Sequence, residues 1–77
     1  MKITETKIGE NYTVVKLHTQ GSLRQRFISF GILKGVTIRY MGRTSLKGTY
    51  EIRVGKMSIA LREQEANKIE VKKYEND

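Results

Sequence analysis

The sequence predicts a single small domain that is mainly β, with five short strands and one short helix. Three observations lead to this prediction. At 77 residues the chain can build one modest core. Four segments alternate apolar and polar side chains with the period of a strand, whereas one segment carries an apolar stripe with helical spacing. Seven glycines supply the turns, because the chain contains no proline.

The first strand is expected in the segment YTVVKLHT, residues 12–19, where β-branched and aromatic residues dominate. Val15 and Leu17 fit its inward face less cleanly than Tyr12 and Val14 do. A helix is then expected at about residues 22–30. Its apolar residues fall at positions i, i+4 and i+7, on one stripe that can face the core: Leu23, Phe27 and Phe30.

Both ends of this helix carry sequence signals. Ser22 and Gln25 have the spacing of a capping box, so we expect them to cap the first turn. Gly31 comes directly after the last apolar position, where a left-handed residue ends a helix at the lowest cost. Ile32 and Leu33 then follow, and both are able to fold back onto the helix.

The rest of the chain predicts strands joined by short turns. A tight turn is expected at Gly35, a type II′ hairpin turn at Gly55, and a 3-10 turn at about residues 63–66. The strands alternate over residues 36–43, 49–54, 57–62 and 68–74. Five strands, one helix and one 3-10 turn in this order describe a small SH3-like barrel over residues 1–77. Residues 43–48 and the tail at 75–77 are expected to be flexible.

The charge of the chain is strongly positive. Fifteen Lys and Arg residues against eight Asp and Glu residues give a formal net charge of +7. Such a surface attracts nucleic acid, anionic lipid or an acidic protein face, although scattered charges of this kind also serve solubility alone. Nucleic acid is the less favoured partner, because stacking on bases needs exposed aromatic rings. Most of the aromatic residues fall in core positions: Phe27, Phe30, Tyr40 and Tyr50.

Catalytic and metal-binding patterns are absent from the sequence. There is no cysteine, and His18 is the single histidine, so we expect neither a metal site nor a cofactor. The chain has no phosphate-binding loop and no nucleophile elbow, so we do not expect an enzyme. No segment has the length of a signal peptide core or a membrane span, which favours a soluble intracellular protein.

Several motifs, in their order and spacing, resemble a known family. They are LRQRF at residues 23–27, FGILKGV at 30–36, VGKMSIALR at 54–62, and the ending EANKIEV at 65–71. This series resembles the ferrous-iron transport protein A (FeoA) family, over about residues 3–72. The chain departs from the family pattern at Lys34, where proline is usual, and at Phe27 and Phe30, which replace aliphatic residues.

The resemblance implies a cytoplasmic, non-enzymatic accessory protein of bacterial ferrous-iron uptake. Its implied partner is the FeoB membrane permease, whose cytosolic part is a GTPase, at the inner face of the membrane. Self-association is a further alternative, and so is a free-standing barrel that binds nucleic acid.

We place the expected partner contact on the edge formed by the helix, the turn after it and the end of the next strand. Its candidate residues are Arg24, Arg26, Leu33, Lys34, Met41 and Arg43. Leu33 is the expected apolar anchor, and the arginines are expected to meet acidic groups. The alternative for Leu33 is a simple core residue.

Overall fold

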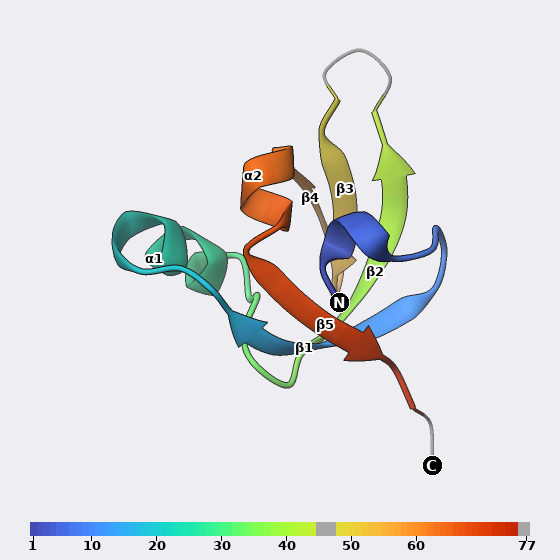
Figure 1. The fold of residues 1–77 in the computed structure, drawn as a ribbon, viewed down its shortest axis with the longest axis horizontal. Helices are drawn as coiled ribbons and strands as arrows, with labels where there is room; N and C mark the ends of the chain where they lie inside the picture. The colour runs from blue at the N-terminus through green and yellow to red at the C-terminus, as the bar shows by residue number, and fades with distance from the viewer. Residues whose placement is uncertain (45–47, 76–77) are drawn as a thin grey trace.

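Five strands form one antiparallel sheet in the computed structural model, which describes residues 1–44 and 48–75. The strand order is β4-β3-β2-β1-β5 (Figure 1). The bounds are β1 Asn11–Leu17, β2 Thr37–Arg43, β3 Tyr50–Val54, β4 Met57–Leu61 and β5 Ile69–Lys73. The predicted mainly β class and the five strands are confirmed. The flexibility predicted for residues 45–47 and 76–77 lies outside the described residues.

The barrel that these strands form is open. β4 and β5 are the two edges of the sheet and do not pair with each other. Figure 1 shows β1 and β5 crossing at a steep angle to β2 and β3. The outer edge of β5 is already used, because Lys2 bridges to Glu70 and the Val71 N–H donates to the Met1 carbonyl at 2.7 Å. The five strands of the predicted barrel are therefore present, but the sheet does not close into a complete barrel.

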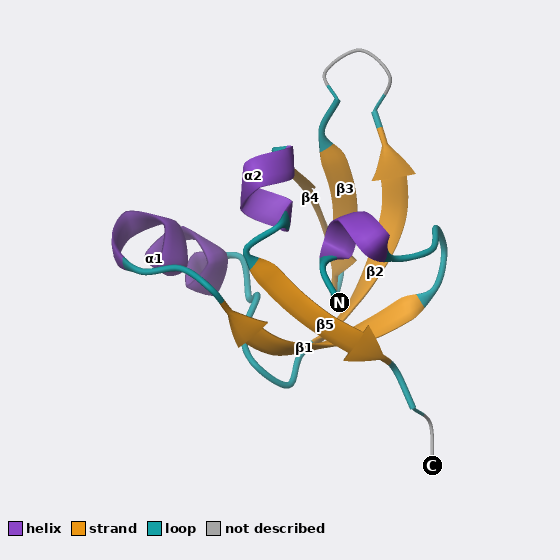
Figure 2. Ribbon diagram, in the orientation of Figure 1, coloured by secondary structure: helices purple, strands orange, loops and turns teal. Residues whose placement is uncertain are grey.

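The helices are α1 Gly21–Ser29, α2 Glu63–Ala66 and a 3-10 turn at Ile3–Glu5, η1 (Figure 2). The helical turn predicted at residues 63–66 is α2, and its hydrogen bonds mix both patterns. Asn67 N–H donates across four residues to Glu63, whereas Lys68 N–H donates across three to Glu65. η1 was not predicted from the sequence, and its Ile3 is buried.

The capping box predicted at the start of α1 is wrong. The N-cap is Gln20, and no side chain makes a hydrogen bond there. The chain enters the helix through Gly21, which has a φ of +66°. Because the helix begins at this glycine, Ser22 lies inside the first turn and cannot occupy the cap position.

The C-terminal end of α1 is a Schellman motif. Gly31 N–H donates to the Ile28 carbonyl at 2.9 Å, and Ile32 N–H donates to the Phe27 carbonyl at 2.9 Å. Gly31 has a φ of +82°, in the left-handed region that glycine enters without strain. Phe27 and Ile32 are both fully buried, so the apolar contact of the motif lies in the core.

The core contains side chains from all five strands, from α1 and from the loops around them. A bulge between Val14 and Lys16 shifts the alternation of β1, so Val14 and Leu17 are both buried and Val15 is half-buried. Met57 at the start of β4 is exposed, because it adjoins the hairpin turn at the end of the sheet. Gly55 begins that turn with a φ of +60°.

Candidate partner-binding site

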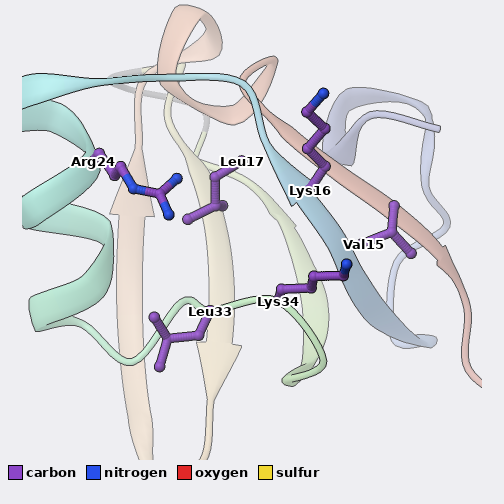
Figure 3. A pocket seen from close by; sticks show the side chains of 6 residues that line it. All are labelled: Val15, Lys16, Leu17, Arg24, Leu33 and Lys34. Carbon is purple, nitrogen blue, oxygen red and sulfur yellow. The ribbon is translucent and has the colours of Figure 1, made fainter.

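An open pocket lies between α1, the end of β1 and the turn that follows α1 (Figure 3). Its volume is about 410 Å³. The residues that line it are Val15, Lys16, Leu17, Arg24, Leu33 and Lys34. Three of these are aliphatic and three are basic, and this set includes no acidic or aromatic side chain. We refer to it below as the basic–apolar pocket.

The turn at one wall of the pocket is fixed to β1 by backbone hydrogen bonds. Val36 N–H donates to the Leu33 carbonyl at 3.0 Å, which closes a four-residue turn. Gly35 N–H donates to the Val14 carbonyl at 2.7 Å, and Val14 N–H donates to the Val36 carbonyl at 2.9 Å. Gly35 has a φ of +91°, as the third position of a type II turn requires. The sequence therefore holds Leu33 and Lys34 against the strand.

Leu33 is a surface residue in this structure. Its exposed fraction is 42%, whereas its neighbour Ile32 is 0% exposed. The Schellman motif explains the difference, because it directs Ile32 back onto Phe27 and leaves the next side chain outside the core. Leu33 was expected to be either an exposed apolar anchor or a core residue, and its exposure excludes the core residue.

The basic side chains lie around the aliphatic floor of the pocket. Figure 3 shows the Arg24 guanidinium directed toward Leu17 and the Lys34 chain directed toward β1, while Lys16 extends away. None of the three forms an ion pair with another described residue. Unpaired cations beside aliphatic surface attract a ligand that combines an anionic group with an apolar one.

The structure separates the other predicted site residues from this pocket. Arg26 forms an ion pair with Glu65 of α2, and its guanidinium lies 5.5 Å from the centre of the Phe30 ring. Arg43 lies 5.0 Å from the ring centre of Tyr50. Met41 lies on β2 and is 37% exposed. Arg24, Leu33 and Lys34 are thus brought together, whereas Arg26, Met41 and Arg43 do not line the pocket.

Sequence reasoning missed the contribution of β1 to the pocket. Val15, Lys16 and Leu17 belong to a segment whose strand character was clear, but the link between this strand and the turn after α1 is a tertiary contact. The available signal was the irregular alternation around Val15 and Leu17, which the bulge in β1 produces.

Titratable groups outside the pocket form a separate pair. Nε2 of His18 lies 2.6 Å from Oε1 of Glu70, and this hydrogen bond lowers the pKa of the Glu70 carboxyl. Within residues 1–44 and 48–75, no three His, Cys, Asp or Glu side chains are placed to hold a metal ion. The helices in this part of the chain include none long and apolar enough to cross a membrane.

Comparison with known proteins identifies the family. The FeoA domain matches residues 1–73. The chain belongs to the FeoA family.

A relative from Helicobacter pylori, named Fe(2+) transport protein A, is 30% identical over 73 residues, which cover 94% of each chain. A Porphyromonas gingivalis relative is named as a fusion of Fe(2+) transport protein A with the Fe(2+) transporter FeoB. It is 28% identical over 71 residues, which cover 92% of this FeoA-family chain and 8% of the fusion.

Solved FeoA structures share the fold of this FeoA-family protein. Iron(II) transport protein A from Clostridium thermocellum superposes with a TM-score of 0.87 at 26% identity, over 95% of this chain and 45% of that one. FeoA from Stenotrophomonas maltophilia, described as an SH3 domain protein, has a TM-score of 0.78 at 24% identity and covers 94% of this chain and 89% of that one. The SH3-like class is therefore confirmed. The relatives of this family are named for Fe(2+) transport.

Proposed function

We propose that this protein is a non-enzymatic accessory protein of bacterial ferrous-iron uptake, located in the cytoplasm at the inner face of the membrane. Its partner in this proposal is the cytosolic GTPase domain of a FeoB-type permease. The observation that carries the proposal is the Porphyromonas gingivalis fusion, in which a segment similar to nearly the whole of this chain is joined to a FeoB transporter. A fusion keeps its two parts together at a high effective concentration, which benefits parts that bind each other.

The basic–apolar pocket is the proposed contact surface for this partner. Leu33 supplies an exposed apolar side chain near Arg24 and Lys34, which have no ion-pair partner among the described residues. Interfaces commonly combine an apolar centre with charged groups that orient the partner. Met41 and Arg43, at the end of β2, are proposed as secondary contacts. Arg26 supports the surface indirectly, because it anchors α1 to α2.

A heteronuclear NMR titration tests the proposal. The labelled protein is titrated with the GTPase domain of the permease from the same organism, near physiological salt. We expect chemical-shift changes at residues 15–17, 24 and 33–34. Leu33→Asp is expected to remain folded and to lose these changes. Ile8→Asp is the matched control, because Ile8 is 68% exposed and does not line the pocket.

The absence of chemical-shift changes on addition of the GTPase domain would contradict the proposed function. A single-stranded oligonucleotide serves as the second titrant. Nucleic-acid binding has little structural support, because four of the six aromatic side chains are buried: Tyr12, Phe27, Tyr40 and Tyr50. Broad shifts with the oligonucleotide, lost steeply as salt rises, would favour it instead.

A further inference from the structure

We propose that the basic–apolar pocket recognises an acidic peptide segment in which a branched aliphatic side chain lies next to a carboxylate. The inference rests on the proposed function, since it states the chemistry of the segment that the permease or another protein partner would present. It goes further in naming what enters the pocket: the aliphatic side chain on the floor, and the carboxylate between the basic side chains.

The apolar half of the pocket comes from two elements of the fold, β1 and the turn that follows α1. Leu17 at the end of β1 is only 9% exposed, whereas Leu33 in the turn is 42% exposed. Val15, also on β1, lines the pocket and is half-buried. Surface that is recessed and aliphatic is suited to one side chain of a partner, because burial there removes apolar area from water on both molecules.

The charged half of the pocket selects an anion. Arg24 from α1 and Lys34 from the turn approach the floor from different elements, and both are exposed (Figure 3). No acidic side chain lines the pocket to neutralise them, and the described residues provide neither with an ion pair. An arginine guanidinium can donate two parallel hydrogen bonds to one carboxylate, and a lysine adds a second cation.

Three other occupants fit these observations less well. A second copy of the chain would bring the same cations together, in a protein whose formal net charge is +7. Nucleic acid gains from base stacking, but no aromatic ring lines the pocket. A lipid surface is flat and takes protruding apolar side chains, whereas Leu17 lies at the bottom of a recess.

Synthetic peptides test the inference on the intact, isotope-labelled protein. The probe is an acetylated and amidated eight-residue peptide with two leucines and four glutamates between two terminal glycines. We expect shift changes confined to residues 15–17, 24 and 33–34. Replacing the leucines by serine should weaken binding by about tenfold, because the apolar burial is lost. Replacing the glutamates by glutamine should weaken it by about fivefold or more, since several exposed charge contacts are lost.

Charge exchange identifies the residues that hold the carboxylate. Arg24→Glu with Lys34→Glu is expected to abolish binding of the acidic peptide and to create binding of the same peptide with lysines in place of glutamates. Lys72→Glu is the control, because Lys72 is exposed on β5 and does not line the pocket. Leu33→Ser should lower affinity for both peptides, and an unchanged amide spectrum outside the pocket will show that each variant is folded.

Three outcomes would overturn the inference: equal binding of the serine and leucine peptides, binding that Lys72→Glu weakens as much as the pocket variants do, or shifts at these residues only with phosphatidylglycerol vesicles or an oligothymidine. The proposed function fails separately. If the GTPase domain binds and shifts other residues, and the acidic peptide does not bind, the inference is wrong whereas the proposed partner is supported. If the peptide enters the pocket and the GTPase domain does not bind, the inference stands and another acidic protein is the partner.

Discussion

The guanidinium of Arg26 on α1 lies 2.5 Å from Oε2 of Glu65 on α2, and this ion pair joins the two helices. Glu65 is only 8% exposed, and its other carboxylate oxygen accepts a hydrogen bond from the Arg62 N–H at 2.9 Å. A carboxylate buried to this degree needs both partners, because desolvation of an unpaired charge is costly. The pair therefore gives Arg26 a role in holding the fold.

Removing the Arg26 charge is expected to destabilise the protein. Arg26→Met keeps an unbranched aliphatic side chain but leaves Glu65 with one fewer donor, so we expect the free energy of unfolding to fall by about 1–2 kcal/mol. Unfolding in urea measures this change in the free energy of unfolding. Arg24→Met, without an ion pair in the described structure, should change stability by less than about 0.5 kcal/mol. Equal effects of the two variants would show that the ion pair contributes nothing specific.

The end of α1 depends on the left-handed backbone of Gly31. Gly31→Ala should lower the free energy of unfolding by about 1–2 kcal/mol, because an L-residue is strained at a φ of +82°. A steric clash is not the cause, since an added Cβ would lie 3.7 Å from the nearest Val54 methyl. Gly31→Asn should recover part of the loss, because asparagine enters this region more readily. A thermal midpoint that is the same in all three proteins would refute this explanation.

The hydrogen bond between His18 and Glu70 makes stability sensitive to acid. This bond lowers the pKa of Glu70 below its ordinary value of 4.5. The stabilisation is therefore fully present above pH 4.5 and is lost as the pH falls through the lowered pKa. In His18→Ala the Glu70 pKa should move back toward 4.5, which a carbon-detected NMR titration of its carboxyl measures. A Glu70 pKa that is unchanged in the variant would assign the shift to another cause.

Ile32 and Leu33 are neighbours whose substitutions are expected to destabilise the protein to very different degrees. Ile32→Ala should cost about 2–5 kcal/mol, because it leaves a cavity in a fully buried site. Leu33→Ser should cost less than about 1 kcal/mol, because its side chain is 42% exposed. Chemical unfolding of the two variants compares them directly. A large loss with Leu33→Ser would mean that this side chain serves the core in solution.

Much of this fold could be predicted from local patterns. The alternation at Tyr50, Ile52 and Val54 gave a strand because one face of it packs against the core and the other meets solvent. Gly31 marked the end of α1 because the requirement for a left-handed residue is a local one. The open edge between β4 and β5 could not be predicted, since it depends on the N-terminal residues that pair with Glu70 and Val71.

The candidate site could be predicted in part for the same reason. Leu33 and Lys34 lie in one local turn, which the sequence marked with Gly35. The ion pair between Arg26 and Glu65 joins residues 39 positions apart, and no local pattern separates a paired arginine from an unpaired one such as Arg24. The assignment of these two side chains required the tertiary structure.

The hydrogen bonds that fix the turn at Gly35 to Val14 have a consequence for the energetics of association. The backbone of the pocket is pre-organised, so a partner need not order it at a cost of about 1–2 kcal/mol of conformational entropy per residue. The cost that remains is the rotamer freedom of exposed lining side chains such as Arg24 and Lys34, at about 0.5–1.5 kcal/mol each. Association should therefore proceed as rigid docking, and substitutions in the pocket should act mainly on the lifetime of the complex.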